Sequence, residues 1–284
     1  FLAVSAGHNI VLDLWFVAGH GRGVAGAAEA TVIAQYVSGL GIAAYTWVRF
    51  PALVRRDPAV RLRRSRIREI AGFSALTCLQ QSIMNLGILA VQGLVNSFGT
   101  TVMAAFAAAV KIDAFAYLPV QDFGNAFSIF ISQNYGAGQR ARIRQGIRTA
   151  AAASVCFGLA LSGLVFLFAP QLMALFIDGA ETAVITEGVR YLRIEGAFYA
   201  LIGLLFLLYG LYRALGRPGM SVVLTVISLG LRVSLAYALA AVPGVGVVGI
   251  WWSVPVGWLL ADAFGLLYYR ARHKTLLPPA PPHP

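Results

Sequence analysis

The sequence predicts an all-α, polytopic membrane protein, and three observations carry this prediction. First, 59% of the 284 residues are hydrophobic and only 12% are charged, against about 25% charged in typical soluble domains. Second, the mean hydropathy is +0.75. Third, the apolar residues gather in runs long enough to cross a bilayer. A soluble domain of this length leaves roughly a quarter of its unfolded-chain surface exposed, so the composition excludes a soluble enzyme and a disordered chain.

Eight hydrophobic runs are candidate transmembrane helices, because crossing a hydrocarbon core of about 30 Å takes about 20 helical residues. A transmembrane barrel would instead need alternating segments of about ten residues. Short turns with Gly or Pro separate several runs, as at Pro243-Gly244. In chain order the runs cover residues 1–18, 24–48, 70–98, 101–133, 146–169, 187–212, 219–241 and 247–269.

The basic residues predict an orientation. The net charge is +11, which in a soluble protein would indicate nucleic-acid binding. Here 17 of the 22 Lys and Arg residues lie on the tail and on the links after the second, fourth and sixth runs, which is the pattern of the positive-inside rule. These links and the carboxy-terminus are therefore predicted to be cytoplasmic, and no nucleic-acid partner is expected. The residues are Arg49, Arg55, Arg56, Arg61, Arg63, Arg64, Arg66 and Arg68, then Arg140, Arg142, Arg144 and Arg148, then Arg213 and Arg217, and finally Arg270, Arg272 and Lys274.

The polar segment 49–69 divides the predicted spans unevenly. Two runs precede it in residues 1–48, and six follow in residues 70–270. The last residues, 271–284, are rich in proline and are expected to form a disordered tail. The uneven division, together with an apolar first residue, predicts that further spans precede residue 1.

Asp13 is the first functional candidate, because a charged side chain at the bilayer centre costs about 2.5–3.5 kcal/mol on insertion scales. Asn9 lies four residues before it, on the same helix face. A carboxylate beside an amide oxygen suits Na⁺, or a carboxyl group that takes up a proton. Thr31 on the next span is a candidate to add a hydroxyl group. The alternative is that Asp13 is a packing residue satisfied by Asn9 or by a backbone carbonyl.

Further polar residues lie within the third and fourth spans. Gln81, Asn85 and Gln92 form a stripe that is predicted to face the bundle interior, where it either bonds other helices or contacts a transported solute. Lys111 and Asp113 are two residues apart and do not face each other. They either form ion pairs between helices or line a water-filled cavity.

The remaining buried charges and the cysteines do not form a catalytic pattern. Arg232 needs a partner, for which Glu195 and Asp262 are the candidates. Cys78 and Cys156 lack metal-ligand or disulfide spacing and are expected to be small buried core residues. The sequence has no phosphate-binding loop, nucleophile elbow or paired-carboxylate pattern. We therefore expect no enzyme, no catalytic residue, no cofactor and no metal other than Na⁺ at Asp13.

The motifs, taken in order, resemble those of the multidrug and toxic compound extrusion (MATE) transporters, whose superfamily also holds lipid-linked-sugar flippases. The resemblance extends over about residues 7–270. The matching segments are Asn9-Ile-Val-Leu-Asp13, Gly23 to Thr31, Asn96-Ser-Phe-Gly99, Lys111-Ile-Asp113, Gln133-Asn-Tyr-Gly-Ala-Gly138, Tyr209 to Gly216, Leu231-Arg232, Gly246 to Trp251 and Gly257-Trp258.

The resemblance implies a twelve-helix fold of two six-helix lobes, of which this chain corresponds to helices five to twelve. Residues 1–48 would be the last two helices of the amino-terminal lobe. Residues 49–69 would be the cytoplasmic linker between the lobes, and residues 70–270 the carboxy-terminal lobe. Helices one to four, with an aspartate that many relatives use in coupling, are expected to lie upstream.

The resemblance also implies a role for individual residues. Asn9, Asp13 and Thr31 match positions that bind Na⁺ or take up H⁺ in prokaryotic relatives. Some relatives have a second site with a Glu on helix seven, where this chain has Gln80 and Gln81. A cation site in the second lobe is therefore not expected.

The expected function is secondary active antiport. The protein would export drug-like, cationic or amphipathic compounds in exchange for Na⁺ or H⁺, by alternating access. Gln81, Asn85, Gln92, Lys111 and Asp113 are the candidates for the substrate cavity. The expected setting is the inner (plasma) membrane, as a multi-pass monomer among membrane lipids. The alternatives are a flippase of lipid-linked oligosaccharide, for which the sequence has few in-membrane cations, and a truncated membrane protein that does not transport.

Overall fold

The computed structural model describes residues 2–51 and 63–276, and these ranges are helical nearly throughout, with no strand. The all-α prediction is confirmed. The chain divides into two compact units, Phe1–Ile67 and Arg68–Pro284, and the division falls inside the polar segment 49–69. Residues 52–62 and 277–284 lie outside the described ranges, so most of the expected linker and of the expected Pro-rich tail cannot be compared with the structure.

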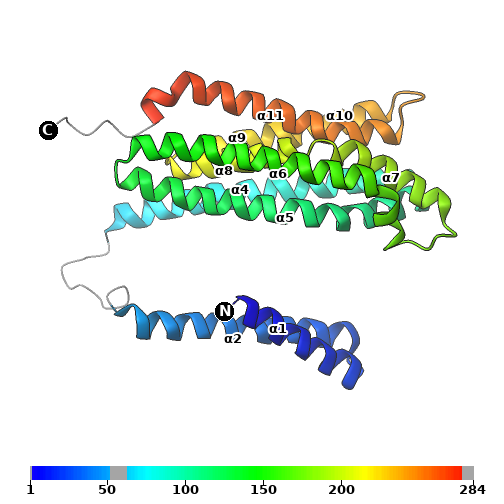
Figure 1. Ribbon diagram of the computed structural model, residues 1–284, viewed down its shortest axis with the longest axis horizontal. Helices are drawn as coiled ribbons and strands as arrows, with labels where there is room; N and C mark the ends of the chain where they lie inside the picture. The colour runs from blue at the N-terminus through cyan, green and yellow to red at the C-terminus, as the bar shows by residue number, and fades with distance from the viewer. Residues whose placement is uncertain (1, 52–62, 277–284) are drawn as a thin grey trace. The chain divides into compact units, whose positions relative to one another are not determined.

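Within each unit the helices follow one another with short connections (Figure 1). In unit 1 they are α1 (Leu2–Asp13), a π-helix η1 (Leu14–Gly19) and α2 (Gly23–Arg49). In unit 2 they are α4 (Arg64–Asn96), α5 (Thr100–Gly136), α6 (Arg140–Ala174), α7 (Thr182–Gly196), α8 (Tyr199–Ala214), α9 (Pro218–Thr225), a second π-helix η2 (Val226–Gly230), α10 (Leu231–Ala240) and α11 (Val247–Leu276).

Six of the eight predicted spans have helices with the length and composition to cross a membrane. They are α4, α5, α6, the continuous segment from α9 to α10, α11, and the pair α7 and α8 if this pair is one span bent by 51°. The other two predicted spans do not reach that standard. The helix α2 has 27 residues but is not among the helices whose hydropathy and charge also suit a membrane span, and α1 with η1 covers only residues 2–19. Their insertion stays a prediction.

Small residues hold unit 1 together. Gly26, Ala30 and Ala34 recur every four residues along α2 and are its buried residues. A side chain at Gly26 would come within 3.0 Å of Phe16 in η1, and the Ser5 hydroxyl of α1 donates to the Ala34 carbonyl at 3.0 Å. A stripe of small residues lets two helix backbones approach closely, as in other membrane helix pairs.

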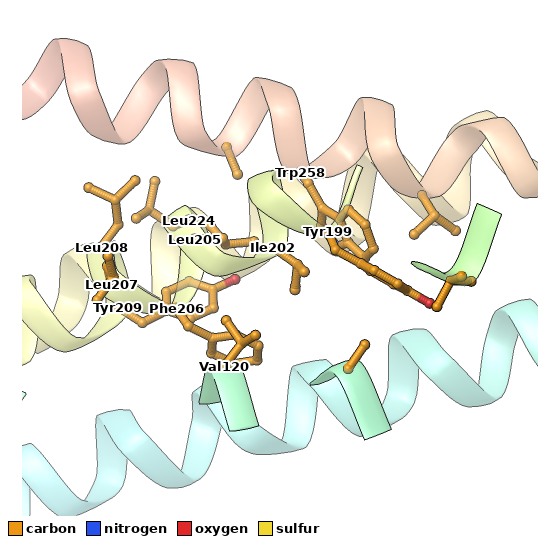
Figure 2. Packing of buried hydrophobic residues seen from close by; sticks show 14 of the residues in the cluster. Val120, Tyr199, Ile202, Leu205, Phe206, Leu207, Leu208, Tyr209, Leu224 and Trp258 are labelled. Atoms are coloured by element: carbon orange, nitrogen blue, oxygen red, sulfur yellow. The ribbon is translucent and has the colours of Figure 1, made fainter. Parts of the chain in front are cut away.

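The helix α8 lies at the centre of unit 2. Its sequence is apolar on every face, and a helix of that kind is stable only where other helices cover it on all sides. The helices α5, α6, α9 and α11 pack around it. Figure 2 shows this core, with Ile202, Leu205 and Phe206 of α8 between Val120 of α5 and Trp258 of α11.

Most basic residues of unit 2 gather at one end of the bundle. The start of α4, the turn from α5 to α6, the turn from α8 to α9 and the end of α11 all lie at that end in Figure 1. These are the segments that carry the arginines predicted to be cytoplasmic. The helical arrangement therefore brings residues that are far apart in the sequence onto one face of the membrane protein.

Two expectations about local structure are wrong. The last helix does not end at residue 270 but continues through Leu276, because nothing in the sequence before Pro278 interrupts it. Cys78 and Cys156 are not buried core residues but exposed ones. A thiol is weakly polar, so in an apolar helix it lies as readily on the outer surface as in the core.

Candidate functional site

The structure brings Asn9 and Thr31 together across α1 and α2. The Asn9 amide nitrogen, Nδ2, donates to Thr31 Oγ1 at 3.4 Å, and Thr31 Oγ1 in turn donates to the Ala27 carbonyl at 3.0 Å. Asp13 lies one helical turn from Asn9. Its Oδ1 atom is buried and has no hydrogen-bond partner within the described ranges. The hydrogen-bonded pair Asn9 and Thr31, with Asp13 one turn away, is the polar group of unit 1, and one acceptor oxygen of Asp13 is left free.

Asp13 stands at a change of helix type, because the π-helix η1 begins at the next residue, Leu14. A π segment has wider hydrogen bonding than an α-helix and often occurs at functional sites. The sequence contains no signal that predicts it. A carboxylate with a free oxygen has the chemistry to accept a small hard cation or a proton. The role of Asn9, Asp13 and Thr31 in coupling nevertheless stays a prediction.

Unit 2 contains a second polar cluster, which is buried and centred on Asp113. Tyr191 of α7 donates its hydroxyl to Asp113 Oδ2 at 2.7 Å, and Tyr199 of α8 donates to Oδ1. Glu195 is 6% exposed, and its Oε2 atom has no hydrogen-bond partner among the described residues. The cluster thus joins α5 to both halves of the bent α7–α8 pair.

The tyrosines of this cluster are functional candidates that the sequence interpretation missed. Tyr191, Glu195 and Tyr199 recur every four residues, a spacing that points to one helix face, and this was the available signal. Hydropathy alone suggests one unbroken span here. It does not reveal the break between Gly196 and Tyr199 that brings Tyr199 to Asp113. Unit 2 therefore does contain buried carboxylates, Asp113 and Glu195, although Gln80 and Gln81 stand where some relatives have a Glu on helix seven.

The structure distinguishes between the two expected partners of Arg232. This residue interacts electrostatically with Asp113 and Glu195, and its Nε atom is buried without a hydrogen-bond partner in the described part of the chain. Asp262, the other candidate, is 3% exposed. Both of its carboxylate oxygens are buried and have no hydrogen-bond partner there. Arg232 therefore belongs with the Asp113 cluster.

A polar pocket of about 290 Å³ lies between α4, α5 and α8. Gln81, one of the predicted cavity residues, lines it. Arg213 reaches across the pocket and donates from Nη2 to Asn125 Oδ1 at 3.1 Å. Its lining residues are Gln80, Gln81, Met84, Gln121, Asn125, Phe206, Tyr209 and Arg213.

The other predicted cavity residues do not line this pocket. Asn85, Gln92 and Lys111 are exposed, and Asp113 is enclosed by its tyrosines. Among the described residues of unit 2, no helix covers the face of α4 that carries Asn85 and Gln92; that these two residues face the interior of the whole protein stays a prediction. Lys111 forms no ion pair within the described residues. The five candidates therefore lie in three environments. One lines the polar pocket, three are exposed, and Asp113 is buried with its tyrosines.

Comparison with known proteins gives consistent matches. The MatE family model matches residues 77–238. The probable multidrug resistance protein YpnP of Bacillus subtilis is 29% identical over 275 residues, which are 95% of this chain and 60% of that protein. The multidrug resistance protein NorM of Burkholderia vietnamiensis is 26% identical over 73% of this chain and 45% of its own.

Solved structures have the same fold. A crystal structure of MATE in complex with MaL6 superposes with a TM-score of 0.89 at 24% identity, covering 96% of this chain and 62% of the other. A transporter of the MOP superfamily from Pyrococcus furiosus gives a TM-score of 0.89 at 24% identity and covers 96% and 61%. The chain thus spans about three fifths of the length of the first of these relatives.

Proposed function

The chain belongs to the MATE family, and on that premise we propose that it is part of a secondary active antiporter that exports drug-like, cationic or amphipathic compounds in exchange for Na⁺ or H⁺. The observation that carries the proposal is the polar group in unit 1. Asn9 and Thr31 meet at 3.4 Å, and the free Oδ1 atom of Asp13 lies one turn away. The group combines the oxygen types that bind a small hard cation with a carboxyl group that can take up a proton.

The proposed mechanism is differential binding of the coupling ion. A ligand shifts a conformational equilibrium only if it binds one state better than the other. Asp13 is at the junction of α1 and η1, where the helix hydrogen bonding changes. Binding at its carboxylate favours one arrangement of this junction, and release favours the other. The junction is therefore the element that we propose changes during alternating access.

The proposed substrate contacts include the polar pocket of unit 2. Side-chain amides dominate its lining, and amides accept hydrogen bonds from cationic or amphipathic solutes without imposing a charge. Arg213 also lines the pocket and keeps its positive charge while it donates to Asn125. A single cation beside amide and apolar side chains suits an amphipathic drug-like compound better than the pyrophosphate of a lipid-linked sugar, which calls for several cations.

We further propose that the protein acts as a multi-pass monomer in the inner (plasma) membrane, with a cytoplasmic carboxy-terminus. The support is the gathering of most arginines of unit 2 at one end of its bundle, because the cytoplasmic side of a membrane protein carries the excess of Lys and Arg.

The test is export by the full-length protein carrying Asp13→Asn. Asparagine keeps the shape but neither binds a proton nor carries a charge, so drug efflux from everted vesicles is expected to fall at least about tenfold, which is about 1.4 kcal/mol of lost coupling. Collapsing the Na⁺ gradient or the pH gradient separately identifies the ion.

The matched control is Asp178→Asn, in the exposed connection between α6 and α7, where the Asp178 side chain accepts a hydrogen bond from the Ala180 backbone. An asparagine retains that bond. Efflux like that of the wild type from a normally expressed Asp13→Asn protein would overturn the coupling role of this site.

A further inference from the structure

A basic pocket of about 570 Å³ lies at the arginine-rich end of unit 2. It is formed where the first turns of α6 meet the last turns of α11, two segments that lie at the same end of the bundle in Figure 1. The residues that line it are Arg144, Ile147, Arg148, Tyr269, Arg270 and His273. None of these described lining residues is acidic.

The arginines of α6 act together at this pocket. Arg140, Arg144 and Arg148 are spaced by four residues, which places them on one face of the helix. All three lie close enough to Tyr269 of α11 for their positive charges to act on its side chain. The Nε atom of Arg140 is buried without a hydrogen-bond partner in the described part of the chain. The pocket thus has a high positive charge, and no carboxylate of the described residues neutralises it.

The position of the pocket selects the kind of anion. It lies at the end of two membrane helices, where the phospholipid headgroups are. Tyr269 and Ile147 give it an apolar wall beside the arginines. Such basic pockets between transmembrane helices are suited to lipid headgroups.

We propose that this pocket binds the phosphate headgroup of an anionic phospholipid. Its volume is much larger than a bare phosphate ion requires, so it has room for the glycerol backbone next to the phosphate. A zwitterionic headgroup is disfavoured, because its ammonium group would lie among the arginines. The lipid then ties the start of α6 to the end of α11, two segments that are separated by more than 100 residues of sequence.

The test uses the full-length protein in detergent, with phosphatidylglycerol, phosphatidylcholine and inorganic phosphate as separate additions. Phosphatidylglycerol is expected to raise the Tm and to be retained in native mass spectrometry, and the other two are not. The triple variant Arg144→Gln, Arg148→Gln, Arg270→Gln is expected to lose this effect. Each basic side chain near an anionic lipid contributes about a factor of five in affinity, so the loss is roughly 100-fold.

The control variant is Arg142→Gln, which removes an exposed arginine from the same turns of α6 but from another face. It is expected to retain the response to phosphatidylglycerol. Three results would overturn the proposal. The triple variant could respond like the control, phosphatidylcholine could stabilise the protein equally, or inorganic phosphate at the same concentration could produce the whole effect.

Discussion

Two phenol hydroxyls hold Asp113 inside unit 2, from Tyr191 at 2.7 Å and from Tyr199 on the far side of the helix break. Tyr191 also packs edge-on against Phe106 and Trp251. Its ring therefore belongs to the apolar core and its oxygen to the polar cluster. A buried carboxylate loses its hydration, so hydrogen-bond donors on neighbouring helices must replace the lost water.

This arrangement predicts that Tyr191→Phe destabilises the protein by about 1–3 kcal/mol, the cost of leaving a buried acceptor without its donor. Phenylalanine keeps the ring contacts, so the loss reports the hydroxyl alone. The Tm in detergent measures it. The control is Tyr237→Phe at a residue that is 51% exposed, where little change is expected. Equal Tm values for the two variants would show that the hydrogen bond from Tyr191 to Asp113 does not stabilise the protein.

The packing of whole helices in unit 2 depends on glycines at points of close approach. A Cβ atom at Gly158 of α6 would lie 2.6 Å from the Cα atom of Ala200 in α8, and one at Gly210 of α8 would lie 2.6 Å from the Gly124 carbonyl oxygen of α5. These neighbours are backbone atoms, which cannot rotate away. The central helix α8 can therefore be covered on all sides only because its contacts include residues without side chains.

The change Gly158→Ala is accordingly expected to lower the stability by about 1–3 kcal/mol, since overpacking forces backbone shifts. The matched control is Gly163→Ala on the same helix, where no atom lies within 4 Å of the new methyl group. That change is expected to be neutral or to stabilise by about 0.5–1 kcal/mol, because alanine favours the helix. Thermal unfolding of the two variants would compare them directly, and a stable Gly158→Ala protein would contradict the close contact.

At the scale of the whole molecule, the distribution of basic residues predicts how unit 2 crosses the membrane. Most of the arginines lie at one end of its bundle, while the connection between α6 and α7 carries the acidic residues Asp178 and Glu181. The positive end is expected inside the cell.

Single cysteines test this orientation after Cys78 and Cys156, both exposed, are replaced by alanine. A membrane-impermeant maleimide is expected to label Gly179→Cys, between α6 and α7, in intact cells. It is expected to label Gln139→Cys, at the start of α6, only after the cells are made permeable. The reverse pattern would invert the predicted topology of unit 2.

The sequence by itself determined the all-helical class, six spans with their approximate limits, and the basic side of the bundle. These features depend on composition and on local runs of residues, because a helix in lipid satisfies its own backbone hydrogen bonds. The spacing of Asn9 and Asp13 likewise follows from the helical repeat alone.

The tertiary structure decided which side chains meet. The helix break that brings Tyr199 to Asp113, the exposure of Asn85 and Gln92, and the pocket shared by Arg144 and Arg270 were not predicted from the sequence. Each depends on which helices touch, and that is set by how side chains of distant segments fit together. Hydropathy reports whether a residue favours the apolar phase, but lipid and protein interior are both apolar, so it cannot tell one from the other.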